Sequence, residues 1–248
     1  MVDLHCHILP GIDDGPKTVE ESIQLVKMEL DNGVDTIAVT PHFSIADQNN
    51  LDNFVHIRNT ANCLLQEELR KQSIVMNIIQ AAEVLLSTDL PEIQGLDKLQ
   101  YAGTDYMLVE LPFGYYYDWI PHTLYRLQLR GITPIIAHVE RFEYLFKETK
   151  NLQELVDTGC LTQINASFLL NAGHFLLKRV YQLYAKGLIH FIVSDAHSMA
   201  NRPPLLKSAM SKIGKKWDCK SVDYFCCNAQ KVIENSHIEL LTHYRTFK

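Results

Sequence analysis

The chain has 248 residues, of which 47% are hydrophobic and 21% are charged, and its net charge is −6. This composition is ordinary for a globular protein, and the acidic balance gives no electrostatic case for binding nucleic acid or an anionic membrane. We find no signal peptide and no apolar run long enough to span a membrane, so we expect a cytoplasmic protein. The six cysteines form no CxxC pair, and we expect free thiols.

Strands and helices alternate along the chain. Short apolar runs predict seven strands, at Val2–Ile8, Thr36–His42, Ile74–Glu83, Asp105–Leu111, Thr133–His138, Leu161–Ala166 and Ile189–His197. Helical patterns predict helices at 18–32, Leu51–Lys71, Trp119–Arg130, 141–148, 151–158, 172–186 and from about 204 onward. Such alternation is typical of an α/β protein with a parallel sheet covered by helices. Seven units in a single domain, 1–248, fit a distorted (β/α)7 barrel better than an open sheet, although periodicity alone does not decide between them.

Residue types that bind metals recur at or near the C-terminal ends of these strands. They are His5, His7, Asp14, His42, Glu83, Glu110, His138, Asp195 and His197. In a parallel β/α barrel all strands open on one face at these ends, so we expect the nine side chains to converge. Because unpaired buried charge is costly, shared cations explain the pattern physically.

The number of candidate ligands indicates more than one ion. Four carboxylates and five imidazoles exceed what one ion takes, so we expect two or three ions, with Glu110 as a natural bridge. All the ligand atoms are nitrogen or oxygen, so Mn²⁺, Fe²⁺ and Zn²⁺ are all possible, and the carboxylate share favours manganese. Such a centre activates water and hydrolyses phosphate esters.

Two arginines and an aromatic loop lie near the same predicted face. Arg141 follows His138 by three residues and is interpreted as a phosphate clamp; Arg202 is either a second phosphate contact or a surface ion pair. The loop Phe113–Trp119 either stacks on an aromatic leaving group or packs over the barrel mouth.

The neighbouring residues are given lesser roles. Cys6 lies between His5 and His7 on the opposite strand face and is interpreted as a core residue, and Asp13 as a residue that shapes the turn before Asp14. The other histidines are interpreted as surface or internally satisfied residues, namely His56, His122, His174, His190, His237 and His243.

The order of these motifs resembles the polymerase-and-histidinol-phosphatase (PHP) superfamily. The matching motifs are His5-Cys-His7, Asp13-Asp14-Gly15, the strand-end His42, Glu83 and Glu110, Ile136-Ala-His138-Val-Glu-Arg141, Ser194-Asp195-Ala-His197 and Asn201-Arg-Pro-Pro. Within that superfamily, the chain looks like the bacterial manganese-dependent protein-tyrosine phosphatases of capsular and exopolysaccharide operons, the CpsB/YwqE type.

The resemblance implies a fold, a metal centre and a substrate. It implies a distorted (β/α)7 barrel holding up to three metal ions, usually discussed as Mn²⁺, with the nine residues above as ligands and Arg141 as the phosphate-binding arginine. It also implies dephosphorylation of phosphotyrosine on a partner tyrosine kinase that controls polysaccharide export. The position after His138, often proline in this family, is Val139.

Two alternatives stay open at this point. One is a PHP phosphoesterase acting on a small metabolite such as histidinol phosphate, which longer enclosing loops would favour; the short loops here favour a protein or peptide. The other is a non-catalytic metal-binding module that regulates a kinase, against which the complete ligand set argues.

Overall fold

Parallel strands form the centre of the structure, a computed structural model that describes residues 1–45 and 51–239. Every strand ladder in it is parallel. The strands are β1 (Val2–Cys6), β2 (Thr36–Val39), β3 (His42–Phe43), β4 (Asn77–Gln80), β5 (Glu83–Leu85), β6 (Tyr106–Glu110), β7 (Thr133–Ile136), β8 (Leu161–Asn165) and β9 (Phe191–Val193).

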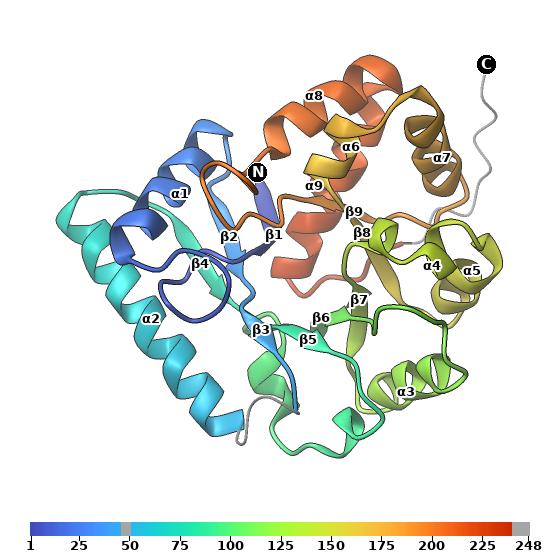
Figure 1. Cartoon of the computed structure of the whole chain (residues 1–248), viewed down its shortest axis with the longest axis horizontal. Coiled ribbons are helices and arrows are strands. Elements are labelled where there is room, and N and C mark those ends of the chain that lie inside the picture. Colours follow the sequence, from blue (N-terminus) through green and yellow to red (C-terminus); the bar gives the residue numbers. More distant parts are fainter. Residues whose placement is uncertain (46–50, 240–248) are drawn as a thin grey trace.

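Helices surround these strands on the outside (Figure 1). They are α1 (Val19–Asp31), α2 (Leu51–Lys71), α3 (Trp119–Gln128), α4 (Glu143–Phe146), α5 (Thr149–Asp157), α6 (Ala166–Asn171), α7 (His174–Ala185), α8 (Leu206–Lys216) and α9 (Cys219–Ile233). Short 3₁₀ helices lie at Leu90–Glu92, Leu96–Leu99 and Val139–Arg141. Thr18 caps α1, since its side chain accepts a hydrogen bond from the Glu21 N–H.

Two of the predicted strands are each broken into two. Thr36–His42 becomes β2 and β3, and Ile74–Glu83 becomes β4 and β5. The ladders explain the breaks, because β2 pairs with β1 and β4 while β3 pairs with β5 in the other sheet. Pro41 lies between β2 and β3 and has no N–H to donate to a ladder. The prediction of two continuous strands was therefore wrong, although their positions were right.

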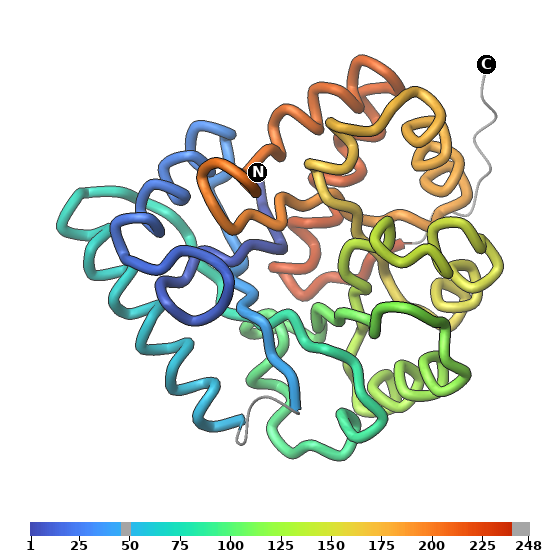
Figure 2. The backbone as a smooth tube through the Cα atoms, viewed as in Figure 1, coloured from blue at the N-terminus to red at the C-terminus, as the bar shows by residue number. Residues whose placement is uncertain are grey.

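The strand order returns on itself. One sheet has the order β1-β2-β4 and the other β3-β5-β6-β7-β8-β9. Beyond β9, an isolated parallel bridge joins Ala196 to Cys6 of β1, and the Asp195 N–H donates to the His5 carbonyl oxygen at 2.9 Å. The tube in Figure 2 shows this segment beside the N-terminal strand. This is the order expected of seven β/α units in a distorted barrel.

Some predicted helices have different limits. The predicted helix 172–186 is α7, and a separate short helix, α6, precedes it; 141–148 contains only the short α4. The helical prediction from about 204 to the chain end is wrong for 234–239, and its remainder lies outside the described residues. Helix α9 ends because Asn235 adopts a left-handed backbone with φ 50°, as helix C-termini commonly require.

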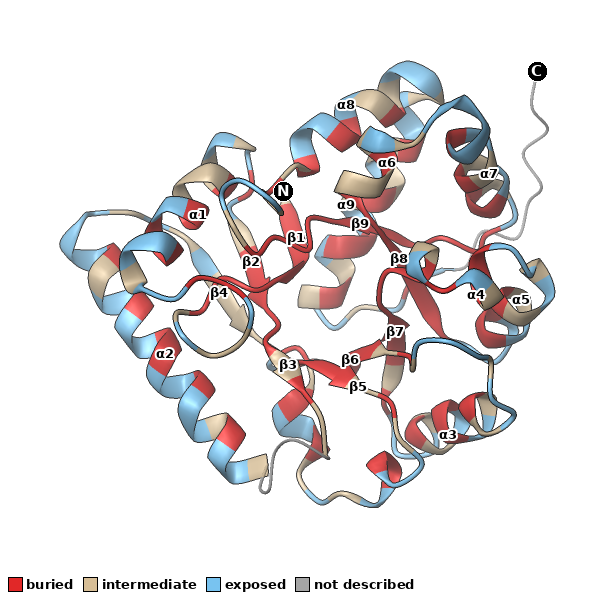
Figure 3. Ribbon diagram, viewed as in Figure 1, coloured by how far each residue is buried: buried red, intermediate tan, exposed pale blue. Residues whose placement is uncertain are grey.

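Most strand residues are buried and the inner faces of the helices complete the core around them, which sets the environment of the strand C-terminal ends (Figure 3). Leu4, Ile37, Leu108 and Ile135 are fully buried on four different strands. Among the described residues, no helix combines the length and apolar character that a membrane span requires.

Candidate metal centre

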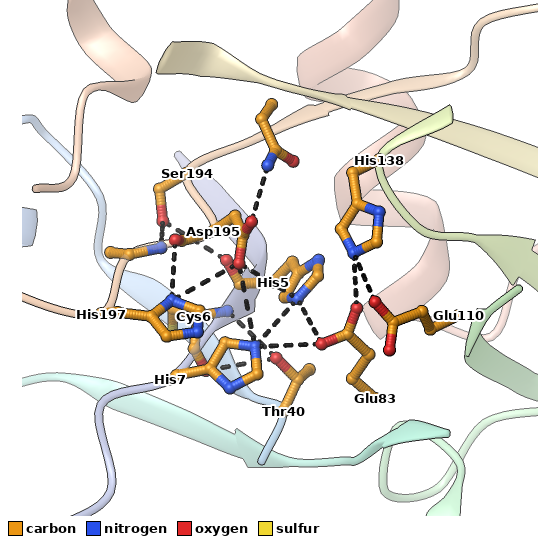
Figure 4. A network of polar contacts seen from close by, with 12 residues as sticks. His5, Cys6, His7, Thr40, Glu83, Glu110, His138, Ser194, Asp195 and His197 are labelled. Atoms are coloured by element: carbon orange, nitrogen blue, oxygen red, sulfur yellow. Dashed lines mark hydrogen bonds and ion pairs between the residues drawn. The ribbon is translucent and has the colours of Figure 1, made fainter. Parts of the chain in front are cut away.

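The nine predicted ligands converge at the C-terminal ends of the strands. Figure 4 shows seven of them, His5, His7, Glu83, Glu110, His138, Asp195 and His197. Within the described chain, three overlapping groups of ligand atoms lie within 4.8 Å of one another: His7, Asp14, His42 and His197; His5, His7 and Glu83; and His42, Glu83 and Glu110. His138 and Asp195 contact members of these groups. The positions of these residues at the ends of the predicted strands therefore predicted which side chains the fold brings together.

The innermost group consists of His5, His7, Glu83 and Asp195, all buried. The Nε2 atoms of His5 and His7 face each other at 3.0 Å, and both lie near Glu83 Oε2, at 3.4 and 3.3 Å. Asp195 Oδ1 lies 3.5 Å from His5 Nε2 and has no hydrogen-bond partner. Two facing imidazole nitrogens share at most one proton, and a buried carboxylate oxygen without a partner is costly. This donor set fits a divalent cation.

Glu83, rather than Glu110, lies at the centre of the cluster. Its Oε1 is 2.8 Å from His138 Nε2, and its Oε2 is 2.9 Å from His42 Nδ1. Burial alone would raise the pKa of Glu83, but the charge of His5 and hydrogen bonds from His138 and His42 hold that pKa well below its usual range. A carboxylate in contact with several imidazoles suits a bridging position.

Glu110 lies farther out, with Oε1 3.5 Å from His138 Nε2 and 14% of its side chain exposed. Burial and the negative charge of Glu83 raise the pKa of Glu110 to about 7. A shared cation would remove the repulsion between these two carboxylates, and so the pair also fits a metal site.

The outer group opens to solvent. Asp14 Oδ1 lies 3.1 Å from His197 Nε2 and 3.4 Å from His42 Nε2, and the His7 and His197 rings stack at 3.9 Å. The side chains of Asp14 and His42 are 60% and 42% exposed. A pocket of about 410 Å³ runs along Asp13, Asp14, His42, Glu83 and Glu110. The cluster is therefore reachable from solvent on this side.

Neighbouring polar residues orient the candidate ligands. Asp13 Oδ2 lies 2.7 Å from His7 Nδ1, the Gln163 amide contacts His5 Nδ1, and Asn165 Nδ2 donates to Asp195 Oδ2 at 2.6 Å. Such contacts fix the orientation of metal-binding histidines and carboxylates. Asp13 was predicted only to shape the turn, and Gln163 and Asn165 were missed. They lie two residues apart in β8, which also contains the polar Thr162, so their spacing alone does not distinguish them.

A buried polar group behind β1 was also missed. Asp3 Oδ1 accepts hydrogen bonds from the backbone N–H groups of Ser194 and His5, and Ser194 Oγ donates to Glu29 Oε1. Burial raises the pKa of both Asp3 and Glu29. These contacts connect β1, α1 and the segment after β9, and so they hold the histidine pair in register with Asp195.

The two predicted arginines differ in their surroundings. Arg202 contacts Asp195 Oδ2 at 2.7 Å and Asp14 Oδ2 at 3.4 Å, so its charge lies against two candidate ligands. Arg141 is exposed, and its guanidinium carbon lies 5.1 Å from the centre of the Phe113 ring. Arg141 is thus the more available of the two for an anion.

Backbone strain occurs at two candidate ligands. His138 has φ 29° and Asp195 has φ 53°, values that non-glycine residues rarely adopt. Strain of this kind persists where the surrounding contacts impose it, often at functional sites.

Most of the residues assigned to background roles lie where expected. Cys6 is buried and its thiol donates to the Ala38 carbonyl oxygen, as a core residue does. Four histidines are exposed, namely His56, His122, His174 and His237. His190 is buried and only partly satisfied, since its Nδ1 accepts a hydrogen bond from the Thr162 N–H but its Nε2 has no partner. His243 lies outside the described residues. All six cysteines are unpaired.

Comparison with known proteins gives matches along almost the whole chain. A family model described as capsular polysaccharide synthesis, CpsB/CapC, matches residues 1–234. The tyrosine-protein phosphatase CpsB of Streptococcus pneumoniae is 32% identical over 248 residues, covering 94% of this chain and 98% of the relative. The tyrosine-protein phosphatase YwqE of Bacillus subtilis is 30% identical over 242 residues, covering 96% and 93%.

A solved structure extends the likeness to the fold. It comes from a study described as crystal structures of YwqE from Bacillus subtilis and CpsB from Streptococcus pneumoniae, unique metal-dependent tyrosine phosphatases. It matches with a TM-score of 0.85 at 27% identity and covers 100% of both chains.

Proposed function

Because this chain belongs to the CpsB/CapC family of capsular polysaccharide synthesis, we propose that it is a metal-dependent phosphotyrosine-protein phosphatase. The observation that carries the proposal is the convergence of buried imidazoles and carboxylates beside an open pocket, with the exposed Arg141 three residues after the candidate ligand His138. Relatives named as tyrosine-protein phosphatases support the choice of substrate. We assign the activity to one phosphoesterase domain, 1–248.

The proposed ligands are the nine converging residues: His5, His7, Asp14, His42, Glu83, Glu110, His138, Asp195 and His197. We propose two or three Mn²⁺ ions there, with Fe²⁺ or Zn²⁺ as alternatives, because all the donor atoms are nitrogen or oxygen. Bound ions would supply an activated water and would offset the charge of the phosphate.

The chain's own residues position the substrate and the ligands. Arg141 is proposed to bind the phosphate oxygens bidentately and to stabilise charge in the transition state. Arg202, held by Asp14 and Asp195, adds positive charge beside these two candidate ligands and is proposed as a second substrate contact. Asp13 and Gln163 hold His7 and His5 in their orientations.

The proposed substrate is phosphotyrosine on a partner tyrosine kinase of a capsular or exopolysaccharide export system. The exposure of Asp14 and His42 at the pocket mouth supports a protein substrate, because a small phosphate ester is usually enclosed. Family membership supports the connection with polysaccharide synthesis.

Phosphate release by the purified chain tests this function. The protein would be treated with chelator, divided, and assayed with and without Mn²⁺ on a phosphotyrosine peptide, the matching phosphoserine peptide and histidinol phosphate. We expect metal-dependent release, fastest from the phosphotyrosine peptide. Faster turnover of histidinol phosphate would favour the small-metabolite alternative, and no metal-dependent release from any substrate would favour the non-catalytic one. Glu83→Gln is the inactive control, since Glu83 contacts the most candidate ligands.

A further inference from the structure

The aromatic loop at the rim of the site divides into packed and exposed side chains. Tyr116 and Trp119 are partly buried and pack against the core. Phe113, Tyr115 and Tyr117 are 53%, 75% and 41% exposed, although they are large and apolar. Packing over the barrel mouth therefore accounts for only part of this loop, and the exposed rings call for another explanation.

Phe113 is the exposed ring of this loop that connects, through Phe142, to the candidate ligand His138. Its ring centre lies 5.1 Å from the Arg141 guanidinium carbon and 5.1 Å from the centre of the Phe142 ring. Phe142 is buried, and its ring lies 5.6 Å from that of His138. Phe113 also follows Glu110 by only three residues. Phe113 thus packs on the Phe142 ring, lies beside the Arg141 guanidinium, and leaves about half of its own surface exposed.

The chain around Phe113 is held in place. Tyr144 Oη donates to the Pro112 carbonyl oxygen at 2.6 Å, and the Leu86 N–H donates to the Glu110 carbonyl oxygen at 2.8 Å. Leu111 is fully buried. These contacts fix where the ring lies relative to Glu110 before any substrate arrives.

We propose that Phe113 determines specificity for aryl phosphate esters: its exposed surface packs against the substrate's tyrosine ring while Arg141 beside it binds the phosphate. The inference rests on the proposed function and deepens it. A phosphotyrosine carries an anion joined directly to an aromatic ring, and the Arg141–Phe113 pair offers a cation joined by contact to an aromatic ring. Phosphoserine has no ring to occupy the second position.

Direct binding tests this assignment without relying on turnover. Calorimetry on the Mn²⁺-loaded chain would compare phenylphosphonate, methylphosphonate and inorganic phosphate. We expect Phe113→Ala to weaken phenylphosphonate about threefold to tenfold, the range that aromatic pairs contribute, and to leave the other two nearly unchanged. Phe113→Leu, which keeps apolar area without a ring, should lose a smaller part. Phe175→Ala, which removes an equally large ring that is 81% exposed on α7, is the matched control.

Two results would overturn the assignment. Equal weakening of all three ligands by Phe113→Ala would mean that Phe113 only positions Arg141, and no weakening of any would mean that the ring has no part in binding. Neither result concerns the proposed function, which fails separately if the wild-type chain releases no phosphate from the phosphotyrosine peptide.

Discussion

His7 and Asp13 show how one neighbouring residue prepares a candidate ligand. The carboxylate 2.7 Å from His7 Nδ1 leaves Nε2 to face His5 and Glu83. We therefore expect Asp13→Asn to weaken Mn²⁺ binding about tenfold to a hundredfold, as loss of such an orienting partner commonly does. Calorimetric titration of the metal-free protein with Mn²⁺ measures the change in affinity. Asp223→Asn, on the exposed face of α9, is the control, and equal affinities in the two variants would contradict the orienting role.

Arg141 gives a second prediction for a single residue. Because Arg141 is exposed and its guanidinium packs beside Phe113, Arg141→Ala should keep its bound metal and lose about a hundredfold to a thousandfold in kcat. Metal content by elemental analysis and turnover of a phosphotyrosine peptide would be measured on the same sample. Arg70→Ala, on the exposed side of α2, is the matched control. Loss of metal from Arg141→Ala would instead make Arg141 part of the metal site.

Which residues of the site could be predicted from the sequence depended on the chemical type of their side chains. Histidines and acids at strand ends are rare enough in a core to stand out, and so the converging set was found before the fold was known. Gln163 and Asn165 carry no such signal, because a polar residue in a strand is equally compatible with many surroundings. Only the fold brings Gln163 to His5, which lies 158 positions earlier in the chain.

The turn between β1 and α1 leaves no room for a side chain at Gly15. A Cβ on Gly15 would lie 2.3 Å from the His7 carbonyl oxygen, and the Gly15 N–H donates to Asp13 Oδ1 at 2.9 Å. Gly15→Ala must therefore push the turn away from β1 and move Asp13 with it. We expect a loss of about 1–3 kcal/mol in the free energy of unfolding, together with weaker Mn²⁺ binding.

Chemical denaturation and metal titration would measure both effects. Gly173→Ala is the control, because a Cβ there meets nothing within 4 Å and should cost less than about 1 kcal/mol. If Gly15→Ala bound Mn²⁺ as tightly as Gly173→Ala, the close approach of the turn to His7 would not matter for the site.

Element positions followed from the sequence more closely than element limits. The helix predicted at about Leu51–Lys71 is α2, which ends at Lys71 as predicted, since a long periodic pattern is unambiguous. The breaks after β2 and β4 were not predicted. They arise because the strands change pairing partners there, and that depends on neighbours remote in the sequence.

For the whole molecule, metal binding and stability should be linked through protons. Burial disfavours the charged form of His7, but hydrogen bonds to Asp13 and Glu83 outweigh it and raise its pKa to about 10. Between the unfolded value of about 6.5 and this value, the folded chain without metal holds a proton that the unfolded chain has lost. The free energy of unfolding of the metal-free chain should therefore fall as pH rises through this window.

A divalent ion takes the place of that proton, so stabilisation by Mn²⁺ should grow over the same window. Thermal unfolding with Mn²⁺ and with chelator, at about pH 6.5 and about pH 9, measures the gap in Tm. We expect a wider gap at the higher pH. A gap that narrows would mean that the ion does not compete with the His7 proton.

The central claim is that the C-terminal ends of six of the seven predicted strands assemble a metal centre that hydrolyses phosphotyrosine. Anomalous X-ray diffraction from crystals of the Mn²⁺-loaded, catalytically active chain tests it most directly. We predict two or three manganese peaks, each within coordination distance of one of the three ligand groups. These groups overlap, because His7, His42 and Glu83 each belong to two of them. Crystals without a peak at these groups, from protein that still releases phosphate from phosphotyrosine, would contradict the account.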